Sequence, residues 1–273
     1  MILFPNAKIN IGLNIFGKRS DGYHNIETVM FPIGICDALE VHESSGGKDD
    51  ISLTTSGISL DVVSENNLIY KAYALLKRDY YLPPVIVHLH KNIPFGAGLG
   101  GGSADAVFML KILNTKFKLN IEDGKLEEYA SCIGSDCAFF VKNKPALSSG
   151  RGEQLEPIRM NLSGYHLVLV FPQILISTAE AYSCVHVGPP ETSLKERINN
   201  PVNDWKHLIN NNFESGLFTS HPLLRKIKED FYLSGAVYAS LTGSGGALYG
   251  LYESEPDPGD WFKDYYIWSE KLL

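Results

Sequence analysis

The chain has 273 residues, of which 44% are hydrophobic and 20% are charged, and its formal net charge is −7. This composition predicts an ordinary globular protein with enough apolar side chains to build a sizeable core. The acidic balance argues against nucleic acid as the main partner, because phosphate backbones favour proteins with a net basic footprint. The sequence contains no apolar run as long as the ~18 residues that a transmembrane helix needs, so no membrane span is expected.

The N-terminal segment begins with apolar residues, but Pro5, Asn6 and Lys8 interrupt it before the core of a signal peptide can form. The cysteines are few and lack the paired C-x-x-C spacing of structural zinc sites. They are Cys36, Cys132, Cys137 and Cys184. We therefore expect no bound structural zinc and a reducing, cytoplasmic compartment.

The first predicted element is a strand over residues 7–15, where apolar and polar residues alternate as in a half-buried strand. Lys8 and Asn10 share its polar face. Residues 39–42 predict a second strand, with residues 51–54 as its hairpin partner. Helical spacing of apolar residues predicts a helix over 66–78, and a strand follows over 85–91.

The second part of the chain continues with a glycine-dense loop at residues 94–103 and then a helix that is apolar nearly all round, which indicates burial. A further helix ends at Ile133, and Gly134 stands where a C-terminal cap glycine belongs. Further strands are predicted at 165–171, 236–242 and 247–252, and residues 187–203 are typical of a surface insertion. Because strands and helices intermingle without regular βαβ alternation, the pattern favours an α+β fold. A composition shift near residues 159–163 predicts a boundary between domains at residues 1–160 and 161–273.

The glycine-dense loop is the strongest functional signal. A helix that begins just after such a loop presents unpaired N–H groups and a partial positive charge, which together form an anion site. A flexible hairpin or a tight packing turn is the alternative. Gly102 stands where a Walker A loop requires lysine, and no buried strand with a terminal acid follows as in a dinucleotide site. The catalytic and metal-binding triplets of protein kinases are also absent.

The segment Pro94-x-Gly-Ala-Gly-Leu-Gly-Gly-Gly-Ser103 resembles the ATP-phosphate loop of the GHMP kinases. Other motifs of that family follow one another in the expected order, at residues 5–13, 17–30, 133–140, 150–153 and 241–246. The resemblance implies a two-part α+β GHMP-kinase fold with the active site in the cleft between the halves. It also implies ATP and Mg²⁺ as cofactors.

The Asp21-Gly-Tyr-His24 segment is similar to one branch of this family in particular. That branch phosphorylates a hydroxyl, the 2-hydroxyl, of the methylerythritol part of a cytidine diphosphate conjugate. The resemblance thus implies a small-molecule substrate, no nucleic-acid or membrane partner, and a monomer or homodimer. The alternatives are a family member acting on mevalonate derivatives, a sugar or homoserine, and a catalytically silent nucleotide-binding regulator.

Carried over by position, the resemblance implies that Asp136 is the catalytic base and that Lys8 is its partner. A positioned carboxylate can abstract a hydroxyl proton, and an adjacent ammonium keeps that carboxylate ionised. From the residues alone, Asp136 could instead cap a short helix over 137–141, and Lys8 could be a solvated strand lysine.

The resemblance assigns ATP binding to Pro94, Gly96, Ala97, Gly98, Leu99, Gly100, Gly101, Gly102, Ser103, Ala104 and Asn66. Helix capping is an equally good interpretation of Asn66 and Asn67. Ala104 stands where the family commonly has a second serine, so any hydroxyl contact to phosphate or metal falls to Ser103.

Substrate binding is assigned by the same resemblance to Asn10, Tyr23, His24 and Tyr182, with the ring of Tyr182 against cytosine. An ordinary core or surface aromatic is the alternative interpretation of Tyr182. His88 and His90 share a strand face and could form a metal pair, but no third ligand is identifiable. Structural or surface histidines are therefore favoured, and no protein metal ligand is assigned.

Overall fold

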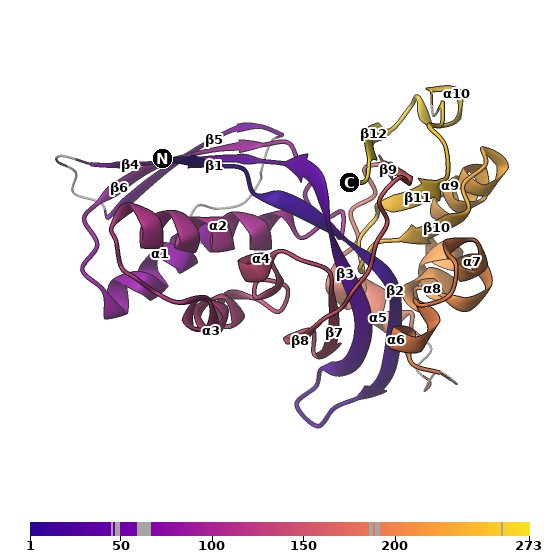
Figure 1. Cartoon of the computed structure of the whole chain (residues 1–273), viewed down its shortest axis with the longest axis horizontal. Helices are drawn as coiled ribbons and strands as arrows, with labels where there is room; N and C mark the ends of the chain where they lie inside the picture. Colours follow the sequence, from indigo (N-terminus) through magenta and orange to yellow (C-terminus); the bar gives the residue numbers. More distant parts are fainter. Residues whose placement is uncertain (45, 47–49, 59–66, 186–187, 189–191, 258) are drawn as a thin grey trace. The chain divides into compact units, whose positions relative to one another are not determined.

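The computed structural model describes the whole chain except residues 45, 47–49, 59–66, 186–187, 189–191 and 258 (Figure 1). The described residues form two compact units, each assembled from separate stretches of the chain. The first unit comprises Met1–Lys8, Gly34–Phe95 and Gly100–Lys144, and the second comprises Ile9–Ile33, Gly96–Leu99 and Pro145–Leu273. The domain boundary at residues 160 and 161, and the cleft between halves, stay predictions.

The sheet of the first unit has the strand order β1-β4-β6-β5, formed by β1 (Ile2–Leu3), β4 (Ala38–Glu43), β6 (Val85–Lys91) and β5 (Ile51–Gly57). The predicted hairpin between residues 39–42 and 51–54 is wrong, because β6 lies between these strands. β6 pairs antiparallel with β4 and parallel with β5. The cause is the helix between β5 and β6, which returns the chain so that the two strands run in the same direction.

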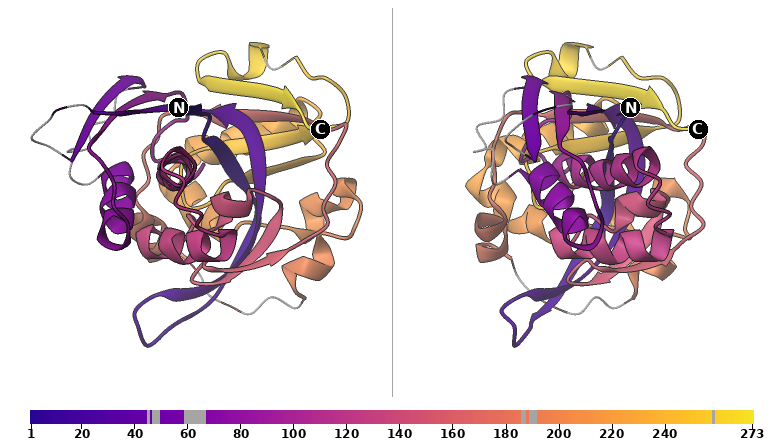
Figure 2. Two further views of the ribbon diagram at one scale, coloured as in Figure 1. Left: turned by 60° about the vertical axis from the view of Figure 1, so that its left-hand side comes forward. Right: turned by 90° about the vertical axis from the view of Figure 1, so that its left-hand side faces the viewer.

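The helices of the first unit lie on one face of this sheet (Figures 1 and 2). They are α1 (Leu68–Asp79), α2 (Gly101–Lys116), α3 (Asp123–Ile133) and α4 (Phe139–Lys142). The predicted burial of the helix after the glycine loop is confirmed, since Ala106, Met109 and Leu110 are completely buried. Gly134 does follow the end of α3, but its backbone is extended and not left-handed.

A second sheet has the order β2-β3-β7-β8, with β2 (Asn6–Lys18), β3 (His24–Cys36), β7 (Ala146–Gly150) and β8 (Gln154–Pro157). The prediction that β2 is half-buried is wrong. Its apolar residues are buried as expected, but Lys8, Asn10 and Asn14 are also no more than 4% exposed. These polar side chains tolerate burial because each has a polar or charged partner.

The remaining sheet belongs to the second unit and is antiparallel, with the order β10-β11-β9-β12. Its strands are β9 (His166–Phe171), β10 (Tyr238–Leu241), β11 (Leu248–Tyr252) and β12 (Tyr266–Lys271). The strands predicted at 165–171, 236–242 and 247–252 are thus confirmed.

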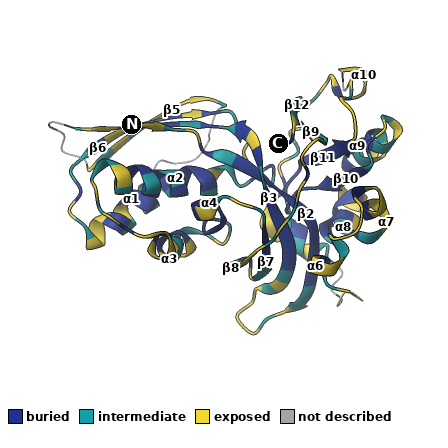
Figure 3. Ribbon diagram, viewed as in Figure 1, coloured by how far each residue is buried: buried dark blue, intermediate teal, exposed yellow. Residues whose placement is uncertain are grey.

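The helices of the second unit are α5 (Thr178–Ser183), α6 (Leu194–Arg197), the 3₁₀ turn η2 (Val202–Asp204), α7 (Trp205–Leu208), α8 (Phe213–Ser220), α9 (Pro222–Leu233) and α10 (Gly259–Phe262). The core joins Phe213, Leu217 and Phe231 of the helices to Leu241 and Leu248 of the sheet. β10 and β11 are buried along their whole length (Figure 3). The helices that the structure describes include none with the length and apolar character to cross a bilayer.

Candidate active site

The glycine loop connects β6 to α2, as its sequence predicts. Gly96, Gly98 and Gly100 have positive φ angles of 68°, 80° and 71°, a conformation that glycine adopts without strain. Gly100 is the N-cap of α2, and the first turn of the helix carries no acidic side chain. The start of α2 therefore combines helix-terminal N–H groups with a favourable dipole, which suits an anion.

Residues 96–99 of this loop pack against the glycine motif that follows β10, and both belong to the second unit. The Thr242 hydroxyl donates to the Gly98 carbonyl at 3.3 Å, and Ala247 N donates to the Ala97 carbonyl at the same distance. The two backbones lie so close that a Cβ on Gly98 would stand 2.0 Å from the Thr242 carbonyl oxygen. Two separate glycine motifs of the sequence thus form one packed backbone cluster.

Lys8 and Asp136 are brought together within the first unit, with Lys8 Nζ 3.2 Å from Asp136 Oδ2. The lysine side chain is 3% exposed, which excludes the solvated alternative, whereas Asp136 is 35% exposed and so remains open to a substrate. The lysine stem packs under the loop, since a Cβ on Gly100 would lie 3.1 Å from Lys8 Cε. Asp136 does not cap α4, which begins at Phe139 after an Ala138 N-cap without a side-chain bond.

Cys137 follows Asp136 in the chain, and its thiol is hydrogen-bonded with Ser103 in the first turn of α2. Burial raises the pKa of the Cys137 thiol to about 12, although a hydrogen bond with Ser103 opposes the rise. Cys137 is therefore an uncharged thiol at neutral pH and does not compete with Asp136 as a base. Ala104 is completely buried and its N–H donates to the Gly100 carbonyl, so the hydroxyl at this turn comes from Ser103.

A buried charge cluster under the start of α2 was missed by sequence reasoning. Lys91 Nζ contacts a carboxylate oxygen of Asp37 and lies 2.8 Å from Asp105 Oδ2. Asp37 Oδ1 also accepts from the N–H groups of Asn92 and Ile93, which fixes the entry to the glycine loop. The available signal was an aspartate, Asp105, inside a helix that is otherwise apolar nearly all round.

Asp105 is the carboxyl group of this cluster whose charged form is disfavoured. Burial raises its pKa to about 7, opposed by the Lys91 ammonium and reinforced by the Asp37 carboxylate. Its second oxygen, Oδ1, is buried and has no hydrogen-bond partner among the described residues. Burial alone would lower the pKa of Lys91, but the two carboxylates outweigh that effect and raise it.

The residues predicted to bind substrate lie in the second unit. The His24 and Tyr182 rings are stacked, with centroids 4.7 Å apart and an interplanar angle of 19°. Tyr182 also meets Phe213 edge to face at 5.0 Å. Tyr23, next to His24 in the β2–β3 turn, is 56% exposed, and the Arg151 guanidinium lies 5.1 Å from its ring centre.

Asn10 is buried, with its amide Nδ2 donating to the Thr28 hydroxyl at 3.0 Å. Its backbone N–H donates to Thr242 Oγ1 at 3.0 Å, which ties β2 to the second glycine motif. Asn66 lies outside the described residues. Its neighbour Asn67 is the N-cap of α1 and accepts from Ile69 N at 2.9 Å, so the capping interpretation is confirmed for Asn67.

His88 and His90 bond to hydroxyl groups of the neighbouring strand β5. Thr54 and Ser56 lie 2.9 Å from the two ring nitrogens of His88, and Ser56 is also 3.0 Å from His90 Nδ1. No group of three potential metal ligands (His, Cys, Asp or Glu) occurs in the part of the chain that the structure describes. The interpretation of His88 and His90 as structural or surface histidines stays a prediction.

Comparison with known families places the chain among phosphate-transferring enzymes. Residues 67–144 match the GHMP kinases N terminal domain, and residues 194–260 match the GHMP kinases C terminal domain. The chain belongs to the GHMP kinases, with their α+β fold, and is an ATP-dependent kinase of a small molecule.

Among curated relatives, the chain is 46% identical to 4-diphosphocytidyl-2-C-methyl-D-erythritol kinase of Bacteroides thetaiotaomicron over 275 residues, which covers 100% of both chains. It is 51% identical to the protein of the same name from Bacteroides fragilis strain YCH46, over 93% of each chain. A crystal structure of 4-(cytidine 5'-diphospho)-2C-methyl-D-erythritol kinase superposes with a TM-score of 0.81 at 26% identity, covering 98% of each chain. Mevalonate kinase of Methanococcus jannaschii shares the fold, with a TM-score of 0.73 at 16% identity.

Proposed function

We propose that this kinase transfers the γ-phosphoryl group of ATP to the 2-hydroxyl of 4-diphosphocytidyl-2-C-methyl-D-erythritol, a step of non-mevalonate isoprenoid precursor biosynthesis. The observation that carries the proposal is the pairing of Lys8 with Asp136 at 3.2 Å under the glycine loop. The names of relatives that share 46–51% of their residues with this chain support the acceptor.

In the proposed mechanism Asp136 is the catalytic base. Its partly exposed carboxylate accepts the proton of the acceptor hydroxyl as that oxygen attacks the γ-phosphorus. The bond from the γ-phosphorus to the bridging oxygen breaks, and ADP is the leaving group. The Lys8 ammonium, 3.2 Å from this carboxylate, offsets negative charge on the reacting oxygens. N–H groups at the start of α2 hold the phosphates in line, so catalysis consists mostly of positioning and electrostatics.

Magnesium is the metal that we propose to accompany ATP, where it offsets phosphate charge. Mg²⁺ is usually held by one or two protein oxygens together with phosphates and water, not by a protein cage. Ser103 in the first turn of α2 and the open carboxylate of Asp136 are the side chains that would face such an ion.

For the cytidine end of the substrate we propose recognition by the rings of Tyr182, His24 and Tyr23. Aromatic faces grip a planar base efficiently, and these rings stand on neighbouring segments of one unit. One face of Tyr182 is already covered by His24. If cytosine stacks on that face, the His24 imidazole must move aside. In its new position the imidazole can form a hydrogen bond with the edge of the base.

We further propose a cytoplasmic enzyme that acts as a monomer or homodimer and does not bind nucleic acid. All four cysteines lie among the described residues and form no disulfide, which fits a reducing compartment. The net charge of −7 disfavours a polyanionic partner.

The test is a panel of acceptors with Mg·ATP, in which ADP release and the phosphorylated product are both measured. The panel contains the cytidine conjugate, methylerythritol phosphate without the cytidine group, mevalonate, homoserine and galactose. We expect turnover of the cytidine conjugate only. Turnover of mevalonate or galactose without the conjugate would refute the acceptor assignment, and ATP binding without turnover of any acceptor would favour the silent regulator.

A further inference from the structure

Within the second unit, the segment Asn210–Asn212 forms hydrogen bonds with β2 on one side and with the end of β10 on the other. Toward β2, Leu13 N donates to the Asn210 carbonyl at 3.0 Å and Asn212 N donates to the Leu13 carbonyl at 2.8 Å. The Asn212 side chain adds a third bond, accepting from Ile15 N at 2.7 Å. The segment is thus fixed to β2 before α8 begins.

Toward β10, the Asn211 side chain uses all of its hydrogen-bonding atoms. Its Nδ2 donates to the Leu241 carbonyl at 3.0 Å and to the Gly243 carbonyl at 2.8 Å, and its Oδ1 accepts from Phe213 N at 3.0 Å. Asn211 is only 2% exposed, so water does not replace these bonds. A single amide therefore fixes the backbone on both sides of Thr242.

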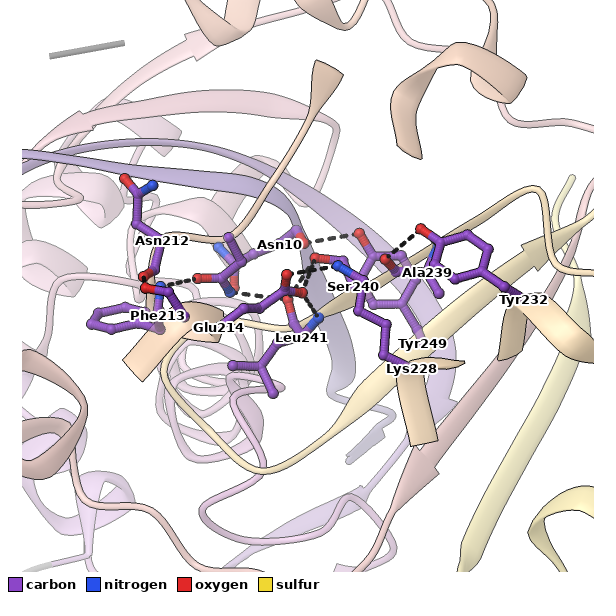
Figure 4. A network of polar contacts seen from close by, with 12 residues as sticks. Asn10, Asn212, Phe213, Glu214, Lys228, Tyr232, Ala239, Ser240, Leu241 and Tyr249 are labelled. Atoms are coloured by element: carbon purple, nitrogen blue, oxygen red, sulfur yellow. Dashed lines mark hydrogen bonds and ion pairs between the residues drawn. The ribbon is translucent and has the colours of Figure 1, made fainter. Parts of the chain in front are cut away.

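Glu214, in the first turn of α8, binds the backbone N–H of Leu241, the residue whose carbonyl is bound by Asn211 (Figure 4). Its Oε1 accepts from Leu241 N at 2.9 Å, while Oε2 pairs with Lys228 Nζ at 2.6 Å. Both the N–H and the C=O of Leu241 are consequently bound by side chains of residues 211–214. This region ends β10 at a defined place and orientation.

The backbone fixed in this way is the backbone on which the phosphate loop rests. Thr242 donates to the Gly98 carbonyl and accepts from Asn10 N, whose own carbonyl accepts from the Tyr249 hydroxyl at 3.0 Å. A Cβ on Gly243 would lie 3.3 Å from the Gly98 carbonyl oxygen. A displacement of residues 242–243 is therefore transmitted directly to Gly98.

We infer that Asn211 is a positioning residue for ATP. Its hydrogen bonds fix the backbone of residues 241–243, on which Gly98 packs, and they thereby determine the conformation of the phosphate loop without contact to the nucleotide. Glu214 supports the same strand end. The inference rests on the proposed function only in assigning the ATP phosphates to the glycine loop, and it concerns ATP and not the acceptor.

The experiment compares Asn211→Asp with the parent enzyme. The substitution keeps the shape of the side chain but places an oxygen opposite two carbonyl oxygens, so residues 241–243 must move. The matched control is Asn114→Asp at the far end of α2, where the amide braces a loop through two bonds to Ile121, at 2.9 and 3.0 Å. Asn211→Ser, which keeps a neutral donor, serves if the aspartate variant does not fold.

The readouts are the affinity for a fluorescent ATP analogue without acceptor and the Michaelis constants for both substrates, at a temperature where each variant is folded. We expect Asn211→Asp to weaken ATP binding and raise KM for ATP roughly 10- to 100-fold, the scale of a misplacement near 1 Å. KM for the acceptor should stay within about threefold, and Asn211→Ser should lie between parent and aspartate.

Unchanged ATP affinity in folded Asn211→Asp, or in folded Asn211→Ser if the aspartate variant does not fold, would overturn the inference. An equal rise of both Michaelis constants would also overturn it, as would the same effect in Asn114→Asp. Because ATP binding is measured without acceptor, an incorrect acceptor assignment would leave this result readable.

Discussion

Gly98→Ala is the substitution whose effect the structure defines most sharply. Gly98 has a φ of 80°, where an L-residue costs about 1–2 kcal/mol. In addition, its new Cβ would stand 2.0 Å from the Thr242 carbonyl oxygen, while Cβ atoms essentially never approach closer than 3.0 Å. The two glycine motifs must therefore separate by about 1 Å, a misplacement that can lower an enzymatic rate about 100-fold.

The assay is steady-state kinetics with ATP varied at saturating acceptor, together with thermal unfolding. The matched control is Gly235→Ala, in the turn between α9 and β10, because Gly235 has a φ of 98° but no atom within 4 Å of its new Cβ. Both variants should lose stability from the backbone strain, but only Gly98→Ala should lose about 100-fold in kcat/KM for ATP. Equal kinetics for the two folded variants would refute the view that the contact between the glycine motifs positions the loop.

Three further predictions concern side chains. Asp136→Asn should lower kcat by at least ~10²-fold with ATP affinity retained, and near-normal turnover would remove Asp136 from the chemistry. Tyr182→Ala should raise KM for the cytidine substrate roughly 5- to 150-fold, the equivalent of ~1–3 kcal/mol of stacking, whereas Tyr182→Phe should be mild; an unchanged KM in the alanine variant contradicts stacking. For Asp105, whose pKa is raised to about 7 in the folded protein but is about 4 in an unfolded chain, folding takes up a proton between these values, so its contribution to stability falls as pH rises through them. The Tm of Asp105→Asn, relative to that of the parent, should therefore rise between about pH 4 and pH 7, and a Tm difference independent of pH would contradict the raised pKa.

Much of the fold was predictable because periodicity reports burial. The strands at 165–171 and 247–252 and the buried helix after the glycine loop carry continuous apolar runs, and the structure has them where the sequence places them. The pairing of the strands was harder to predict from the sequence. The order β4-β6-β5 depends on the chain returning through α1, and neither the period nor the composition of residues 51–54 distinguishes a hairpin partner from a parallel neighbour.

The described part of residues 188–203 shows the same limit. Its polar composition predicts a surface insertion, yet Leu194 is completely buried. It packs at Gly12, where a Cβ would stand 2.8 Å from Leu194 Cδ1. Ser193 and the Leu194 N–H are held by the Glu27 carboxylate, at 2.7 and 2.9 Å. One apolar residue in a polar stretch finds its pocket through tertiary contacts that local composition does not record.

In the candidate site, too, some residues could be predicted from the sequence and others could not. Residues that act through backbone or spacing, such as the glycines of the loop, were accessible because their motif is local. The polar residues that support them were not, since Asn211, Glu214 and Asp105 resemble ordinary solvated or capping residues until their partners are known. For Asn211 these partners lie 30 and 32 residues further along the chain.

β2 shows why a polar residue in a strand should be interpreted through its partner. Lys8, Asn10 and Asn14 occupy alternate positions on what the sequence presents as a solvated face, yet all are buried. Each has a different partner: the Asp136 carboxylate, the Thr28 hydroxyl and the Glu27 carboxylate, respectively. A buried polar group without a partner would cost ~1–3 kcal/mol, so each of these side chains depends on the partner that it has. Through these contacts β2 holds the ammonium beside the proposed base and ties Asn10 to the glycine motif that packs against the glycine loop.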